Sequence, residues 1–181
     1  QEDQYHVGQL DIERQKAPTV LKNILQKCET SAKEKIYDES GSTATLTHLS
    51  TQGVLTVAAV GDAPAIFFAK NKQSGTVKMI PLTHDHEPVD FFERSRIYEQ
   101  GGRVINKSEV MRVDGILNLT RAIGDFNFKE LNEQDNEKKG DHISSEPDVV
   151  QIDVSNYLNE NYDVCVLNAC DGILNHGDAN R

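Results

Sequence analysis

The sequence predicts an α+β fold in which helices flank antiparallel strands. Three observations lead to this prediction: a helical pattern of apolar residues over 17–37, a succession of short runs rich in Val, Ile, Thr and Phe, and turn residues between those runs, as at 50–53 and 71–75. Short connections are typical of antiparallel pairing, because parallel strands need a crossover of a dozen or more residues. We therefore expect a layered domain that contains an antiparallel meander.

The first helix is predicted over residues 17–37. Apolar residues recur there three and four positions apart, which places them on one face of a helix. Pro18 fits the first turn, because the N–H that proline lacks has no partner within the helix at that position.

A second helix is predicted to begin near Pro88 and to end at Gly101 and Gly102, which are typical start and stop signals. One of three residues before the proline is expected to cap its start: Asp85, His86 or Glu87. Its apolar side is expected to comprise Phe91, Phe92, Ile97 and Tyr98.

The strands are predicted from runs of β-branched and aromatic residues bounded by turn residues. They cover residues 43–49, 54–60, 65–69, 77–82, 103–105, 110–113, 149–154 and 164–169. The charged segment 129–141 is predicted to be a solvated loop, because it contains few apolar residues.

Composition limits the function classes. With 181 residues, of which 37% are hydrophobic, the chain is expected to form one domain. The formal charge of −10 argues against a nucleic-acid partner, which requires clustered Lys and Arg. No apolar stretch approaches the roughly 20 residues of a membrane span, so none is expected.

The three cysteines, Cys28, Cys165 and Cys170, have neither a disulfide-framework spacing nor a zinc spacing. They are predicted to be buried thiols, which favours a reducing intracellular compartment such as the cytoplasm or nucleus. Because the chain opens on Gln1 rather than Met, we expect the native N-terminus to lie upstream, and the compartment itself stays open.

Two aspartates follow predicted strands directly and adjoin a glycine. Asp171 comes after the strand 164–169 and precedes Gly172, and Asp62 comes after the strand 54–60 and follows Gly61. Carboxylates at strand ends suit hard Mg²⁺ or Mn²⁺ ions. The alternative is a structural Asp-Gly turn. Both interpretations stay open for Asp62, whereas the surrounding motifs favour the metal for Asp171.

Other polar residues have structural interpretations. Arg121 and Asp125 are predicted to form an ion pair that ties their loop to the sheet. His84 and His86, with Asp90 nearby, also permit a zinc site, but their spacing departs from known zinc motifs and no further His cluster completes a ligand set. The capping role is therefore the preferred interpretation of His86.

Several motifs occur in a fixed order: Gly-Ser-Thr-Ala at 41–44, Val-Gly-Asp at 60–62, Leu-Thr-His-Asp-His-Glu-Pro at 82–88, Gly-Gly-Arg-Val at 101–104, the run 109–129 and Ala-Cys-Asp-Gly-Ile at 169–173. Their order and spacing resemble the metal-dependent type 2C Ser/Thr protein phosphatases (PPM-type). The resemblance implies a sandwich of two antiparallel sheets flanked by helices, in α-β-β-α order. It also implies a single, partial phosphatase domain over residues 1–181.

The resemblance implies hydrolysis of phosphoserine and phosphothreonine in a protein substrate by a water held between two or more Mg²⁺ or Mn²⁺ ions. On the same resemblance, the metal ligands are Asp171, the early pair Glu2 and Asp3, and Asp62 at a further, weaker site. Catalytic and substrate-binding residues stay unassigned. A flap that affects substrate choice makes Arg103, Lys107 and Arg112 candidate phosphoprotein contacts.

The sequence departs from the family pattern at several places. No Asp-Gly-His-Gly segment, which supplies the bridging aspartate in the family, stands between Asp3 and the first helix. Ala63 and Pro64 replace the usual Ser-Arg, Asn175 replaces a second aspartate, and no final Asp-Asn motif precedes Arg181. The alternative function is therefore a catalytically inactive phosphatase-like binding or regulatory module.

Overall fold

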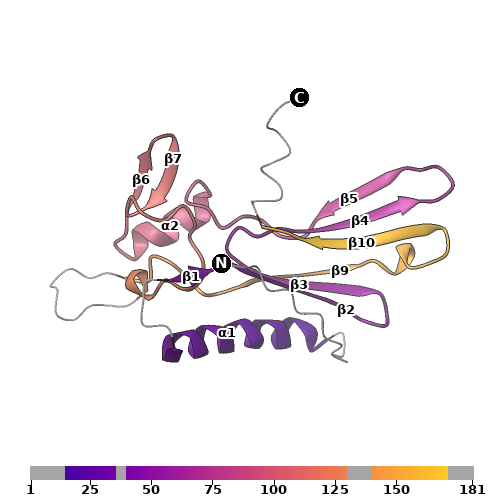
Figure 1. Cartoon of the computed structure of the whole chain (residues 1–181), viewed down its shortest axis with the longest axis horizontal. Coiled ribbons are helices and arrows are strands. Elements are labelled where there is room, and N and C mark those ends of the chain that lie inside the picture. Colours follow the sequence, from indigo (N-terminus) through magenta and orange to yellow (C-terminus); the bar gives the residue numbers. More distant parts are fainter. Residues whose placement is uncertain (1–14, 36–39, 130–139, 171–181) are drawn as a thin grey trace.

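Two three-stranded antiparallel sheets and one long helix form the main body in the computed structural model (Figure 1). The structure describes residues 15–35, 40–129 and 140–170. The first sheet has the order β2-β3-β9, and the second has the order β10-β4-β5. The bounds are β2 Ala44–Leu49, β3 Val54–Val60, β9 Asp148–Asp153, β4 Ala65–Asn71, β5 Val77–Pro81 and β10 Tyr162–Asn168.

The α+β fold class and its two antiparallel sheets are confirmed, but the single meander is wrong. β3 pairs with β2 and β9, whereas the next strand, β4, pairs with β5 and β10. The chain therefore passes from one sheet to the other in the four residues 61–64, between the end of β3 and the start of β4. This short crossing carries Asp62.

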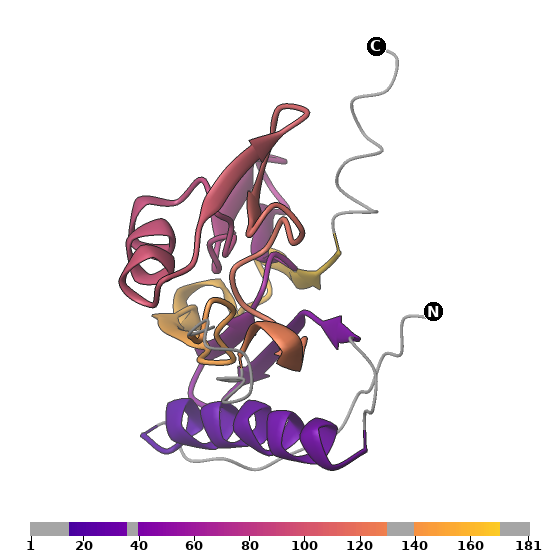
Figure 2. The same ribbon diagram turned by 90° about the vertical axis from the view of Figure 1, so that its left-hand side faces the viewer.

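β3 is buried along its whole length because it is covered on both faces. Leu55 and Val57 face the second sheet and share a core with Phe67 of β4. Ala58 and Val60 belong to a separate core that α1, Ala17–Lys35, covers with Leu21 and Leu25. The layers are therefore α1, the first sheet and the second sheet, as Figure 2 shows from one end.

α1 begins at the predicted residue and is helical to Lys35, and the last two residues of the prediction, 36 and 37, lie outside the described part of the chain. Pro18 is its second residue, and Lys33 and Lys35 lie in its last turn, where positive charge interacts favourably with the helix dipole. α1 covers the outer face of the first sheet and also packs against Ile123, near the end of that sheet.

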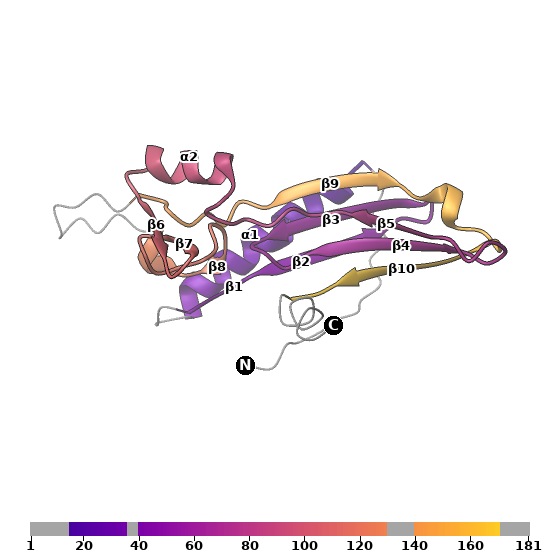
Figure 3. The ribbon, with the colours of Figure 1, turned by 90° about the horizontal axis from the view of Figure 1, so that it is seen from above.

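A smaller region lies at one end of the sheets (Figure 3). It contains α2 Phe91–Glu99, the hairpin of β6 Val104–Lys107 and β7 Val110–Val113, and the short pair of β1 Gly41–Ser42 and β8 Ile123–Gly124. The 3-10 turn η1 Phe126–Phe128 also belongs to this region, whereas the 3-10 turn η2 Ser155–Tyr157 packs against the core between the two sheets. Ile97, Val113, Ala122 and Ile143 form the core of this region.

α2 differs from its prediction in two respects. Its N-cap is Asp90, whose side chain accepts hydrogen bonds from the backbone N–H groups of Phe92 and Glu93, so neither Asp85, His86 nor Glu87 caps it. Its apolar side is also wrong: Ile97 is buried, but Phe91, Phe92 and Tyr98 are exposed. The side chain that faces inward one turn before Ile97 is Glu93, which is 3% exposed.

The prediction of buried thiols is wrong. Cys28 and Cys165 are exposed, and Cys170 is half-buried. The inference of a reducing compartment loses this support. Within the described part of the chain, no helix is long and apolar enough to cross a membrane.

Candidate functional site

The crossing between the two sheets holds Asp62 in a half-buried position directly after Gly61. Gly61 has a φ of +97°, and a Cβ atom there would lie 2.3 Å from the Thr43 Cγ2 atom. A residue with a side chain would therefore be strained and would collide with Thr43. The sharp turn that places Asp62 at the end of β3 thus requires glycine.

The end of β10 lies beside this crossing. The Ala169 N–H donates to the Pro64 carbonyl oxygen at 3.0 Å, and Asn168 pairs with Ala65 in the sheet. The Asn168 side-chain amide also contacts the Thr47 hydroxyl of the first sheet, at 3.3 Å. The end of β10 is therefore tied to the crossing that follows β3 and, through Thr47, to the first sheet.

Of the four predicted metal ligands, only Asp62 lies among the described residues. Glu2, Asp3 and Asp171 lie outside them, as does Asn175. Within 15–35, 40–129 and 140–170, no three His, Cys, Asp or Glu side chains form a group that could hold a metal ion.

Negative charge gathers around Asp62. Burial raises the pKa of Glu87, and the charges of Asp85 and Asp62 raise it further. Carboxylates that repel one another at a sheet crossing are stabilised by a divalent cation, and their oxygens suit Mg²⁺ or Mn²⁺. These oxygens are of the type that a hard cation prefers, although the described residues alone do not form a metal-binding group.

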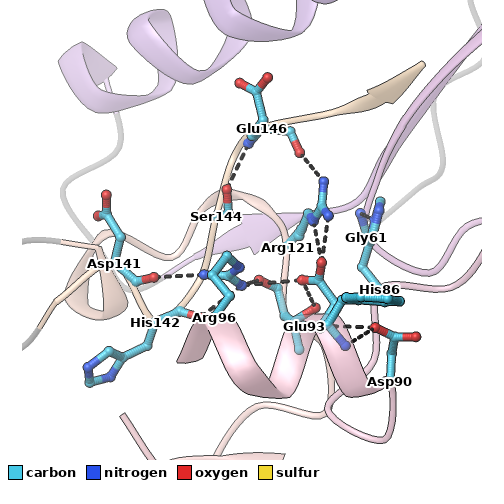
Figure 4. A network of polar contacts seen from close by, with 12 residues as sticks. Gly61, His86, Asp90, Glu93, Arg96, Arg121, Asp141, His142, Ser144 and Glu146 are labelled. Atoms are coloured by element: carbon cyan, nitrogen blue, oxygen red, sulfur yellow. Dashed lines mark hydrogen bonds and ion pairs between the residues drawn. The ribbon is translucent and has the colours of Figure 1, made fainter. Parts of the chain in front are cut away.

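Beside the crossing, an arginine and a buried glutamate form the centre of a polar network (Figure 4). The Arg121 guanidinium donates to Glu93 Oε1 from Nε at 3.0 Å and from its NH2 group at 2.5 Å. The other Glu93 oxygen accepts from the Thr120 hydroxyl at 2.7 Å and from Arg96 at 3.3 Å. Arg121 also donates to Asp148 Oδ1 at 2.9 Å.

These contacts determine the charges of the network. Burial alone would raise the pKa of Glu93, but the hydrogen bonds from Arg121 and Thr120 and the charges of Arg121 and Arg96 outweigh it and lower the pKa to about 2. Burial likewise opposes ionisation of Asp148, yet the charge of Arg121 and the contact with His86 lower its pKa. Both carboxylates are therefore ionised at neutral pH.

The predicted Arg121–Asp125 pair is wrong. Arg121 does tie its loop to the sheet, but through Asp148 of β9 and Glu93 of α2. Asp125 lies against Gly41, where burial raises its pKa despite the opposing charge of Lys129. It adopts a left-handed backbone conformation with a φ of +52°.

The zinc interpretation of the histidines has no support in the described region. His86 is fully buried, and its Nδ1 atom accepts a hydrogen bond from the Gly61 N–H at 3.0 Å. Its Nε2 atom lies 3.2 Å from Asp148 Oδ2. Burial and the charge of Arg121 lower the pKa of His86, against the opposing effect of Asp148, so the ring is neutral at neutral pH. Both ring nitrogens are thus directed at protein groups.

The hairpin of β6 and β7 contains the three candidate phosphoprotein contacts. Arg103 and Lys107 are exposed, at the base and the tip of the hairpin respectively. Arg112 is half-buried and donates to the Ile116 carbonyl oxygen at 2.7 Å. Arg112 is therefore engaged within the hairpin, and the two exposed cations are better suited to meet a partner.

Acidification is expected to destabilise the protein through Glu93. Its folded pKa of about 2 lies below the unfolded value of 4.5, so its stabilisation is present above pH 4.5 and is lost as the pH falls toward 2. We expect urea unfolding to show a loss of about 2 kcal/mol from this group between pH 7 and pH 3. Glu93→Gln removes the titration. If its stability falls as steeply with pH as that of the parent chain, Glu93 is not responsible.

Comparison with known proteins shows one consistent family. A family model described as "Protein phosphatase 2C" matches residues 3–180. Protein phosphatase 1L of Bos taurus is 34% identical over 139 residues, which cover 75% of this chain and 34% of that protein. Protein phosphatase 2C homolog 3 of Schizosaccharomyces pombe is 38% identical over 136 residues, 75% of this chain and 28% of that protein.

The human integrin-linked kinase-associated serine/threonine phosphatase 2C is 31% identical over 136 residues, which cover 75% of this chain and 30% of that protein. The chain thus spans about a third or less of the length of these curated relatives. Among solved structures, a C. elegans sex determining protein has a TM-score of 0.66 and 26% identity, and the match covers 91% of this chain and 35% of that one.

Proposed function

The chain belongs to the protein phosphatase 2C family, and from this premise we propose that it is a metal-dependent phosphatase that hydrolyses phosphoserine and phosphothreonine in proteins. Two or more Mg²⁺ or Mn²⁺ ions are its proposed cofactors. Its relatives include an integrin-linked kinase-associated serine/threonine phosphatase 2C, which supports this reaction. The observation that carries the proposal is the tie between the end of β10 and the crossing that follows β3, since the crossing carries Asp62 and β10 leads to Asp171.

We propose that Asp62, Asp171, Glu2 and Asp3 hold the metal ions. The hydrogen bond between Ala169 and Pro64 supports a shared site for the two strand-end aspartates. Asp62 stands two residues before Pro64, and Asp171 stands two residues after Ala169. The charges of Asp85 and Asp62, which add to the effect of burial in raising the pKa of Glu87, give further support, because a bound cation would neutralise them.

The carboxylate oxygens of this chain would bind the ions, and the polar network would keep the crossing in place. Bound Mg²⁺ or Mn²⁺ would neutralise charge on the phosphate and activate water as the nucleophile. Arg121 anchors Asp148 and Glu93 on one side of the crossing. The exposed Arg103 and Lys107 would meet the acidic phosphoprotein. We further propose that residues 1–181 belong to a single domain, which the core shared by both sheets supports.

A catalytically inactive, regulatory module of the same fold is the second candidate. It is favoured by one feature: residues 4–16 contain no Asp-Gly-His-Gly segment, which supplies a bridging aspartate in the proteins that this chain resembles. An inactive module would bind a phosphoprotein without hydrolysing it. It would also bind Mn²⁺ weakly, because ligand charge sets the affinity for hard cations.

Phosphate release separates the two candidates. The full-length protein is incubated with phosphoserine and phosphothreonine peptides in Mn²⁺, in Mg²⁺ and in excess chelator. A phosphatase is expected to release phosphate with either metal and to stop when the chelator is added. Binding of the phosphopeptide without any release, over a range of pH and Mn²⁺ concentrations, would support the inactive module and contradict the enzyme. Calorimetric titration measures the Mn²⁺ affinity independently, and weak binding would favour the inactive module.

A further inference from the structure

His86 forms two hydrogen bonds with the backbone of Gly61. Its Nδ1 atom accepts from the Gly61 N–H at 3.0 Å, and its own backbone N–H donates to the Gly61 carbonyl oxygen at 3.3 Å. The His86 side chain is 0% exposed, so water does not compete for these groups. Both polar groups of one glycine are thus bound by one residue, directly before Asp62.

The imidazole ring is itself held from its far side. Because Nδ1 accepts a hydrogen bond, the proton of the neutral ring is on Nε2. Nε2 lies 3.2 Å from Asp148 Oδ2 without forming a hydrogen bond, so the contact is electrostatic. The backbone oxygen of His86 accepts from the Thr120 N–H at 2.8 Å. The ring therefore has one orientation, with Nδ1 toward Gly61.

We propose that His86 is a positioning residue, which fixes the Gly61–Asp62 backbone through Nδ1 and thereby holds the Asp62 carboxylate ready for a divalent cation. This inference rests on the proposed function, because it gives Asp62 a cation to bind. Glycine loses more conformational freedom on ordering than any other residue, so a ligand that follows one needs an external anchor. An anchored ligand binds more tightly because less ordering remains to be done on binding.

Two substitutions separate the roles of the ring nitrogens. In His86→Asn, the amide oxygen stands close to the position of Nδ1 and can accept from the Gly61 N–H. In His86→Gln, the amide reaches the position of Nε2 and leaves the Gly61 N–H without its partner. Loss of a partner that orients a metal ligand costs about 10- to 100-fold in metal affinity. We expect about 10-fold weaker Mn²⁺ binding for His86→Gln, similar to Asp62→Asn, and less than about threefold for His86→Asn.

The experiment measures Mn²⁺ affinity by calorimetry, and the melting temperature of each variant shows that it is folded. His84→Asn is the matched control, because this exposed ring lies 5.4 Å from the His86 ring, centroid to centroid, and its removal is expected to leave Mn²⁺ affinity unchanged. Equal Mn²⁺ affinities for His86→Asn and His86→Gln would overturn the positioning role. If His86→Gln does not fold, His86→Asn decides alone, and an affinity as low as that of Asp62→Asn overturns the inference.

Phosphate release from a phosphopeptide, measured in parallel, separates this inference from the proposed function. If the wild-type protein binds Mn²⁺ but releases no phosphate, the phosphatase proposal fails while the Mn²⁺ affinities of the variants still decide the role of His86. If the wild-type protein releases phosphate and the two His86 variants bind Mn²⁺ alike, only the positioning role fails. If the wild-type protein binds no Mn²⁺, both are overturned.

Discussion

Arg121→Ala is expected to lower the free energy of unfolding by about 3–5 kcal/mol, because it leaves a buried carboxylate without its partner. The Glu93 side chain is 4% exposed, and it accepts two hydrogen bonds from Arg121. Alanine removes both, together with the contact to Asp148. Arg96 remains near Glu93, but only at 3.3 Å, so it compensates a part of the lost charge. Urea unfolding at neutral pH measures the loss.

Two further variants show whether the loss comes from the buried charge. Arg103→Ala removes an exposed arginine from the neighbouring hairpin, and its effect is expected to stay within about 0.5 kcal/mol. The double variant Arg121→Met with Glu93→Leu removes both charges, and much of the stability is expected to return. A loss below about 1 kcal/mol in Arg121→Ala would contradict the central role of this pair.

Asp171→Asn is expected to reduce phosphate release by more than about 100-fold. Substitution of a residue that only orients a metal ligand costs up to about 100-fold, so loss of a ligand carboxylate is expected to cost at least as much. The neutral amide removes a negative charge from the proposed metal centre, which also weakens Mn²⁺ binding. Steady-state kinetics over a series of Mn²⁺ concentrations measures both effects, and high Mn²⁺ is expected to restore part of the activity.

Asp163→Asn is the matched control on the same strand. This aspartate lies near the start of β10, its side chain is 68% exposed, and it pairs with Lys72 at the surface. The Asp163→Asn variant is expected to release phosphate at the same rate as the wild-type protein. If Asp171→Asn retains more than about a third of the wild-type activity, Asp171 is not a ligand that the reaction needs.

The elements of the fold could be predicted closely, but their pairing could not. The strand predicted over residues 54–60 is β3 to the residue, because a run of small apolar and β-branched residues lies between clear turn signals. One of its two partners, β9, however, lies almost a hundred residues further along the chain. Local patterns carry no information on such a distant partner, and so the adjacent strand β4 looked equally suitable.

α2 shows where a short pattern misleads. In a nine-residue helix, three exposed aromatic residues outweigh the single buried Ile97 in any count of apolar side chains. The buried Glu93 is one helical turn before Ile97, which places both on the same face. A signal for the cap was also present, since Asp90 followed three residues later by Glu93 is a capping-box spacing. Pro88 favoured a start of the helix that is earlier than Phe91, because proline is a typical residue of the first helical turn.

Residues of the site could be predicted where a local sequence motif marks them. They could not be predicted where their role depends on tertiary contacts. Asp62 could be found because a strand and a glycine precede it. The role of His86 depends on Gly61, 25 positions away, and on Asp148, which is more distant still. Nothing in the spacing of a histidine reveals which backbone N–H group its ring will meet.

Because both faces of β3 are covered, the two hydrophobic cores share one strand, and we expect them to unfold together. Detachment of α1 would uncover Ala58 and Val60, and separation of the sheets would uncover Leu55 and Val57 of the same strand. Local opening on one face of β3 is therefore expected to affect the core on its other face. The crossing that carries Asp62 begins at the end of this strand, so we expect its backbone N–H groups to exchange slowly with solvent.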